Sequence, residues 1–246
     1  MTFYIGLCGD AGAGKDTVAN IMYTYFADEE QFGVSAKKYS FAEPVYKLAA
    51  AILGTTVANL EDRKTKEVTQ SWQITQRSLV AARDYFNSIG LDHYKDFPEA
   101  WHQFMPNLAD FIQPYSPLYE KEDTLYTLAI SPRKMLELVG TELGREILQQ
   151  DVWVDRIVRD VALNKVRVAI ISDVRFENEA KFIQDKEGEL IKIACPSNPY
   201  KINSTHASNK GINTEFITDV IVNKMDGIDK LEESVHATCW CLEQDI

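Results

Sequence analysis

A glycine-rich run near the N-terminus constrains the fold of this chain more than any other feature. The run Gly9–Thr17 contains the pattern GxxxxGK and directly follows the apolar segment Phe3–Cys8. Apolar residues at helical spacing then extend from Val18 to Tyr25. A strand, a glycine-rich turn and a helix in this order are the setting of a phosphate-binding loop. Because glycines let backbone N–H groups turn toward one point, the sequence predicts a site for the phosphates of a nucleoside triphosphate.

The candidate residues of this loop are Gly12, Gly14, Lys15, Asp16 and Thr17. Lys15 supplies a mobile positive charge for the β- and γ-phosphates. Asp16 stands where such loops usually carry Ser or Thr, and the hydroxyl follows one place later at Thr17. Asp16 therefore either orients water bound to Mg²⁺ or caps the first helical turn. The alternative for the whole run is a glycine-rich turn with a surface lysine.

Composition and charge exclude several classes of protein. The 246 residues are 45% hydrophobic and 26% charged, as in a soluble globular protein. No apolar run approaches the roughly 18 residues that span a bilayer, and no signal-peptide pattern is expected. The cysteines form no CxxC pair, which favours a reduced, cytosolic protein. The net charge of −11 argues against an extended basic surface, so we expect neither a nucleic-acid nor a membrane partner.

Apolar runs alternate with helical patterns along most of the chain. Strands are expected at about 3–8, 37–41, 166–172, 190–195 and 220–223. Helical spacing follows the glycine-rich loop and recurs at 42–53, 131–147, 154–161, 176–186 and 231–242. This alternation predicts a three-layer α/β fold with a mostly parallel sheet.

Residues from about 55 to 130 form the least regular part of the sequence. They contain a charged stretch, Glu61–Glu67, a predicted helix, Ser78–Ser88, and a segment rich in proline and aromatic residues, Phe97–Tyr119. The prolines of the last segment argue against one continuous helix there; they are Pro98, Pro106, Pro114 and Pro117. We expect an insertion that covers the active site within a single domain of residues 1–246.

In open α/β sheets, ligands bind beyond the carboxyl ends of the strands. This rule selects the glycine-rich loop, residues 40–43, and Asp173 with Arg175. Asp173 either holds Mg²⁺ through water, accepts hydrogen bonds from a nucleoside, or caps the helix that follows. Arg175 either bridges anionic phosphates, or pairs on the surface with Glu177 or Glu179.

Further candidates lie outside the ends of the predicted strands. Arg133 precedes a helix and either holds the phosphate of an acceptor substrate or forms a surface salt bridge. Gly140 and Thr141 interrupt a helical pattern, where glycine costs about 1 kcal/mol relative to alanine. Either an acceptor base or a neighbouring helix is therefore expected to approach closely there. Trp153 is either an aromatic wall for a base or a core residue, and His206 lies in a loop that could border an adenine.

The order and spacing of these motifs resemble the deoxynucleoside monophosphate kinases of tailed bacteriophages. The resemblance is carried by Gly14 to Thr17, Arg133, Gly140 to Leu143, Trp153, and Asp173 to Arg175 with Glu179. It extends from the N-terminus to the last helix, and residues 55–130 match least. It implies a P-loop kinase fold with a five-stranded, mostly parallel sheet and a largely helical insertion.

The resemblance also implies a reaction, in which the γ-phosphoryl group of ATP passes to a deoxynucleoside monophosphate with Mg²⁺. It implies a homodimer that serves phage DNA precursor synthesis in the host cytoplasm. It assigns ATP binding to Gly12, Gly14, Lys15, Asp16 and Thr17, with Mg²⁺ held through water near Asp16, Thr17 and Asp173. It assigns catalysis to Lys15, Arg133, Asp173 and Arg175, and acceptor binding to Val45, Tyr46, Lys47, Arg133, Gly140, Thr141, Trp153, Asp173, Arg175 and Glu179.

Two other functions are compatible with these motifs. One is another small-molecule P-loop kinase, such as a kinase that acts on dephospho-coenzyme A. The other is a nucleotide-dependent binding protein that transfers no phosphoryl group.

Overall fold

The computed structural model describes residues 2–27, 35–91, 93–94, 97–98, 100–116, 124–199 and 211–246. The chain divides into two compact units. Unit 1 comprises Met1–Phe41 and Ile157–Ile246, and unit 2 comprises Ala42–Arg156. Unit 2 contains the whole of the insertion expected at about 55–130, and the single-domain organisation of residues 1–246 stays a prediction. No helix among the described residues is long and apolar enough to cross a membrane.

Unit 1 is built on a five-stranded sheet with the order β2-β7-β1-β8-β9. The strands are β1 (Phe3–Cys8), β2 (Ala36–Tyr39), β7 (Val168–Ile171), β8 (Glu189–Ala194) and β9 (Asp219–Val222). Every neighbouring pair in this sheet is parallel. β7 is buried along its whole length, which explains its continuous apolar sequence. The predicted parallel sheet is therefore confirmed.

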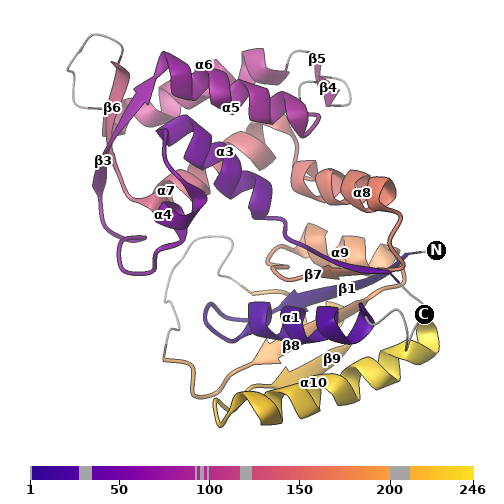
Figure 1. The fold of residues 1–246 in the computed structure, drawn as a ribbon. Coiled ribbons are helices and arrows are strands. Elements are labelled where there is room, and N and C mark those ends of the chain that lie inside the picture. The colour runs from indigo at the N-terminus through magenta and orange to yellow at the C-terminus, as the bar shows by residue number, and fades with distance from the viewer. Residues whose placement is uncertain are drawn as a thin grey trace. The chain divides into compact units, whose positions relative to one another are not determined.

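Helices cover both faces of this sheet (Figure 1). On one face, α1 (Lys15–Phe26) and α10 (Ile228–Leu242) pack on a core that includes Ile5, Leu7 and Ile193. On the other face, α9 (Glu177–Asp185) contacts β1 and β8, and Phe182 meets the ring of Tyr4 edge-on. Short 3₁₀ turns follow at η4 (Thr214–Phe216) and η5 (Glu243–Asp245). Unit 1 thus has the predicted three-layer architecture.

Unit 2 is mostly helical. Its helices are α3 (Glu43–Leu53), α4 (Val57–Glu61), α5 (Gln76–Ser88), α6 (Ala100–Ile112), η1 (Gln113–Tyr115), α7 (Pro132–Glu137), the π-helix η2 (Leu138–Leu148) and α8 (Val152–Asn164), which continues into unit 1. An antiparallel pair of strands, β3 (Gln70–Thr75) and β6 (Thr124–Ile130), accompanies them, with a short pair, β4 (His93–Tyr94) and β5 (Phe97–Pro98). Neither pair was expected within the insertion.

The described part of the proline-rich segment is divided among β5, α6 and η1, so it does not form one continuous helix, as expected. Pro106 alone differs from this expectation, because α6 runs through it. The helix buries Trp101 and Phe104, whose stacked rings lie 5.5 Å apart, and this packing offsets the missing N–H donor. Helical spacing was expected over 131–147, but Ile147 at its end is only half-buried, whereas Leu148 is buried. The π-helix has wider turns, closed by i→i+5 hydrogen bonds, and it shifts the buried face.

Candidate functional site

Two glycines give the phosphate-binding loop its shape. Gly14 has a φ of 99° and precedes the first residue of α1, and an added Cβ would lie 2.6 Å from Nδ2 of Asn223. Gly9 has a φ of 136°, and an added Cβ would lie 2.4 Å from the carbonyl oxygen of Ile193. Both positions therefore require glycine for conformation and for space. The loop places the N-terminus of α1 where an anion can bind.

Lys15 lies at the centre of this loop. Its Nζ donates hydrogen bonds of 2.9 Å to the carbonyl oxygens of Gly9 and Asp10, and its side chain is half-buried. Burial, together with the nearby guanidinium of Arg175, lowers the pKa of Lys15 below its ordinary value. An ammonium group in this position gains stability when an anion binds beside it, because the anion favours the charged form.

Asp16 lies in the first turn of α1 and does not cap it. The residue at the N-cap is Gly14, and no side chain accepts a hydrogen bond there. The capping alternative for Asp16 is therefore wrong. Asp16 is exposed, and Thr17 is half-buried one residue further along the helix.

Two asparagines that the sequence did not single out hold the loop from outside. Asn198 donates through Nδ2 to the carbonyl oxygen of Ala11 at 2.8 Å. Asn223 donates through Nδ2 to the carbonyl oxygen of Ala13 at 3.0 Å, and its side chain is buried. Asn223 directly follows β9, and its Oδ1 accepts a hydrogen bond from the amide of Met225. Both side chains bind carbonyl oxygens of the loop, so they do not compete with an anion for its N–H groups.

A crevice in unit 1 opens at this loop. Its lining residues are Cys8, Gly9, Asp10, Ala11, Lys15, Val174, Arg175, Lys192, Gly211, Ile212 and Ile217. Lys15, Arg175 and Lys192 supply positive charge to one space, although the chain as a whole carries a net charge of −11. The structure thus brings Arg175 to the phosphate-binding loop, as the position after β7 predicted.

Asp173 ties two strand ends together. Its Oδ1 accepts a hydrogen bond from the amide of Phe41, and its Oδ2 accepts one from Oγ of Ser40, both at 2.8 Å. Asp173 is buried, and it contributes a favourable electrostatic interaction to Lys15. These contacts exclude the alternative in which Asp173 caps the following helix, because α9 begins at Glu177 and is capped by another carboxylate.

That carboxylate belongs to Glu179, which is 1% exposed. Its Oε2 accepts hydrogen bonds from the amides of Arg175 at 2.7 Å and of Phe176 at 3.1 Å. Glu179 therefore fixes the backbone of Arg175 and does not pair with its guanidinium. Arg175 is exposed, and within the described ranges no ion pair joins it to Glu177 or Glu179.

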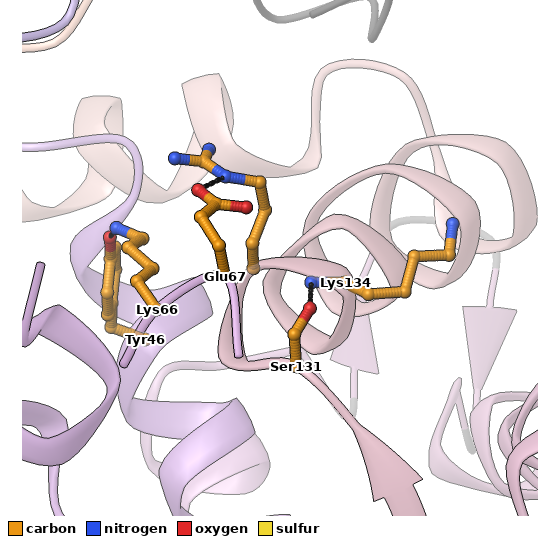
Figure 2. Close-up of polar contacts among 6 residues, drawn as sticks. Tyr46, Lys66, Glu67, Ser131 and Lys134 are labelled. Carbon is orange, nitrogen blue, oxygen red and sulfur yellow. Dashed lines mark hydrogen bonds and ion pairs between the residues drawn. The ribbon is translucent and has the colours of Figure 1, made fainter. Parts of the chain in front are cut away.

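In unit 2, the loop after α4 contacts two of the predicted acceptor residues, Tyr46 and Arg133. Lys66 lies over the ring of Tyr46 at 4.8 Å and donates a hydrogen bond to its hydroxyl (Figure 2). The neighbouring Glu67 accepts a hydrogen bond from Nε of Arg133, whose amide donates to the carbonyl oxygen of Lys66 at 3.0 Å. Arg133 thus forms the salt bridge that was the alternative to phosphate binding. The contact uses Nε and leaves the terminal nitrogens for a further anion.

The environment of Gly140 and Trp153 matches the packing alternative. Trp153 is 1% exposed, and its Nε1 donates to the carbonyl oxygen of Gly140 at 2.8 Å. A Cβ on Gly140 would lie 3.2 Å from Cγ1 of Val45, so α3 approaches η2 closely at this point. Trp153 and Val45 are therefore core residues of unit 2, and their contact with an acceptor base stays a prediction.

The remaining candidates carry less structural information. Lys47 is exposed and forms an ion pair with Glu43 one helical turn earlier. Thr141 is half-buried within η2. His206 lies outside the described residues.

The sheet order, the GxxxxGK loop at the start of α1 and the cation-lined crevice define a P-loop kinase fold with a phosphate-binding site. A family model described as deoxynucleotide monophosphate kinase matches residues 103–235. The chain is similar to the deoxynucleoside-5′-monophosphate kinase of Escherichia phage T5, with 40% identity over 245 residues that cover 97% of this chain and 96% of the relative.

A protein of Acanthamoeba polyphaga mimivirus, whose name also contains the words deoxynucleotide monophosphate kinase, is 34% identical over 103 residues. This match covers 37% of the chain and 52% of that relative. The chain belongs to the deoxynucleotide monophosphate kinase family, and it is a phosphotransferase that acts on nucleotides. The resemblance to the phage enzymes is confirmed.

Proposed function

We propose that this protein transfers the γ-phosphoryl group of ATP to a deoxynucleoside monophosphate and releases ADP and the deoxynucleoside diphosphate. The observation that carries the proposal is the crevice in which Lys15 and Arg175 meet the glycine-rich loop. The T5 relative, which matches nearly the whole chain, supports the choice of acceptor by its name.

The chemistry is a single in-line transfer. A phosphate oxygen of the acceptor attacks the γ-phosphorus of ATP, and the bond to the β,γ-bridging oxygen breaks as ADP leaves. No general base is needed, because a monophosphate oxygen is already anionic near neutral pH. Lys15 and Arg175 stabilise the charge that spreads over the transferred group. Glu179 positions Arg175, and Asn223 positions the loop amides through Ala13.

Mg²⁺ fits the oxygen groups near the loop. The carboxylates of Asp16 and Asp173 both interact electrostatically with Lys15, and Thr17 adds a hydroxyl in the first turn of α1. Among the described residues there is no cluster of three or more His, Cys, Asp or Glu side chains that forms a metal cage. This arrangement suits Mg²⁺, which keeps several waters and binds chiefly to substrate phosphates. When bound, the ion neutralises phosphate charge.

In this proposal, Arg133 binds the acceptor through its terminal nitrogens, with Tyr46 and Lys66 beside it. Lys47, Gly140, Thr141 and Trp153 complete the proposed acceptor region, with Gly140 and Trp153 acting through packing. We assign the activity to DNA precursor synthesis in the cytoplasm of an infected cell, carried out by a homodimer. Sedimentation velocity tests the dimer, and a purely monomeric protein at working concentration contradicts that part.

A panel of acceptors tests the proposed function. ATP-dependent ADP release is measured with dTMP, dGMP, dCMP, dAMP, their ribose counterparts and dephospho-coenzyme A. We expect at least one 2′-deoxy monophosphate to stimulate ADP release, and Lys15→Met to abolish that stimulation. Preference for dephospho-coenzyme A would establish the alternative kinase. Tight ATP binding with no stimulation by any acceptor would establish the nucleotide-dependent binding protein.

A further inference from the structure

Lys192 occupies an unusual place for a charged residue in a central strand. It lies in β8 opposite Cys8, the last residue of β1 before the phosphate-binding loop. Its neighbours in sequence, Ile191 and Ile193, belong to the buried core beneath α1 and α10. Because side chains alternate along a strand, Lys192 projects from the opposite face of the sheet, where it is exposed.

On that face, Lys192 lines the same crevice as Lys15 and Arg175. Its positive charge interacts with Cys8, the residue directly before the loop. Burial raises the pKa of the Cys8 thiol, and the positive charges of Lys192 and Lys15 act in the opposite direction. The lining of the crevice therefore places Lys192 beside the loop, and the direction of its effect on Cys8 agrees with this position.

Across the ranges that the structure describes, the ammonium of Lys192 takes part in no hydrogen bond or ion pair. Two other exposed lysines of unit 1 do pair with carboxylates, Lys181 with Asp185 at 2.8 Å and Lys230 with Asp226 at 3.0 Å. Like charges that share a crevice repel one another, and a bound polyanion relieves that repulsion.

We propose that Lys192 is a third cation for the donor, and that its ammonium binds the triphosphate of ATP beside Lys15 and Arg175. The inference rests on the proposed function for the identity of the donor. A lysine suits this task, because a compact ammonium on a long stem can follow a phosphate group that moves during transfer. The glycine-rich motif did not indicate this residue, because β8 lies far from the loop in sequence.

Calorimetric titration with Mg-ATP and with inorganic tripolyphosphate tests the assignment. The variants are Lys192→Met, Lys192→Arg, and Lys181→Met as the matched control on an exposed helix face of the same unit. We expect Lys192→Met to weaken the binding of both ligands about tenfold, as for the loss of one charge-assisted contact. Lys192→Arg should retain most of the affinity, and Lys181→Met should behave as the wild type.

The loss in Lys192→Met should shrink at high salt, because screening weakens an exposed charge contact. A merely structural role would leave this salt dependence unchanged and would lower the melting temperature instead. If the wild type binds both ligands and Lys192→Met binds them equally well, Lys192 is not a donor residue and the proposed function stands. If the wild type binds neither ligand, both the assignment and the proposed function fail.

Discussion

Asn223 shows how one buried side chain controls the phosphate-binding loop. Its amide nitrogen binds the carbonyl oxygen of Ala13 and lies where a Cβ on Gly14 would have to fit. Its own amide donates to the carbonyl oxygen of Ala194 at 2.8 Å, which ties the end of β9 to the end of β8. The loop amides therefore take their orientation from two neighbouring strands of the sheet.

Replacing Asn223 by alanine should impair the donor site in particular. We expect kcat/KM for ATP to fall about tenfold, because misoriented loop amides stabilise phosphate charge less well. Asn223→Asp should reduce it further, because a carboxylate would face the carbonyl oxygen of Ala13. KM for the deoxynucleoside monophosphate should stay near the wild-type value in steady-state assays. Asn164→Ala, at an exposed asparagine of unit 1, is the control. An equal loss for both substrates would contradict a specific role.

The depressed pKa of Lys15 predicts an early alkaline limit for donor binding. The folded-state pKa lies below the ordinary 10.5, since burial and Arg175 disfavour the charged form. As pH rises through this lowered pKa, the ammonium loses its proton and its attraction for phosphate. We expect kcat/KM for ATP to fall with rising pH before pH 10.5 is reached. In Lys15→Arg, this fall should begin at a higher pH. A profile that stays flat up to that pH would contradict the environment described for Lys15.

At the scale of single residues, the sequence indicated the candidate binding residues but not the side chains that hold them in place. Lys15 and Arg175 lie in local motifs whose spacing reflects their chemistry, and the structure brings both to one crevice. Asn223 binds a residue 210 positions away, so no local pattern could reveal the contact. Only its position directly after an apolar strand offered a signal.

At the scale of elements, α9 depends on a carboxylate that also serves the site. Glu179 accepts hydrogen bonds from the amides of Arg175 and Phe176 ahead of the helix, and it is almost fully buried. A carboxylate in the first turn also interacts favourably with the helix dipole. The start of α9 and the position of Arg175 are therefore set by one side chain.

Removing this carboxylate should affect stability and activity together. Glu179→Ala leaves two amide donors without their acceptor, and we expect the free energy of unfolding to fall by about 1–3 kcal/mol. Urea denaturation measures this loss, with Glu177→Gln in the same helical turn as the exposed control. At temperatures where the variant is folded, kcat should also decrease, because Arg175 is less well held. A destabilised variant with wild-type kcat would show that Glu179 is needed for folding alone.

The elements of unit 1 were predictable because the spacing of their apolar residues matches the faces that they bury. β7 is apolar throughout since it is buried on both faces, and α10 carries its buried residues at helical spacing. In unit 2, tertiary contacts override local propensity. Aromatic packing holds α6 together through Pro106, and a π-helix replaces the α-helix expected around Gly140. β3 and β6 pair across 48 or more intervening residues, so no local pattern in either strand indicated the pairing.

At the scale of the whole molecule, an acidic protein concentrates positive charge in one crevice. The net charge of −11 disfavours long polyanions such as nucleic acids, whereas Lys15, Arg175 and Lys192 offer a local site for a small one. This charge distribution agrees with membership of a family whose relatives are named as kinases of nucleotides. In the proposed reaction, the donor's terminal phosphate passes directly from this crevice to a monophosphate.

Tracing the γ-phosphate of ATP tests this transfer most directly. ATP labelled in the γ-phosphate is incubated with enzyme and an accepted deoxynucleoside monophosphate, and the products are separated by chromatography. We expect the label to appear in the deoxynucleoside diphosphate in a one-to-one ratio with ADP, with little inorganic phosphate. Label that appears in inorganic phosphate alone, with the deoxynucleoside monophosphate unchanged, would contradict it.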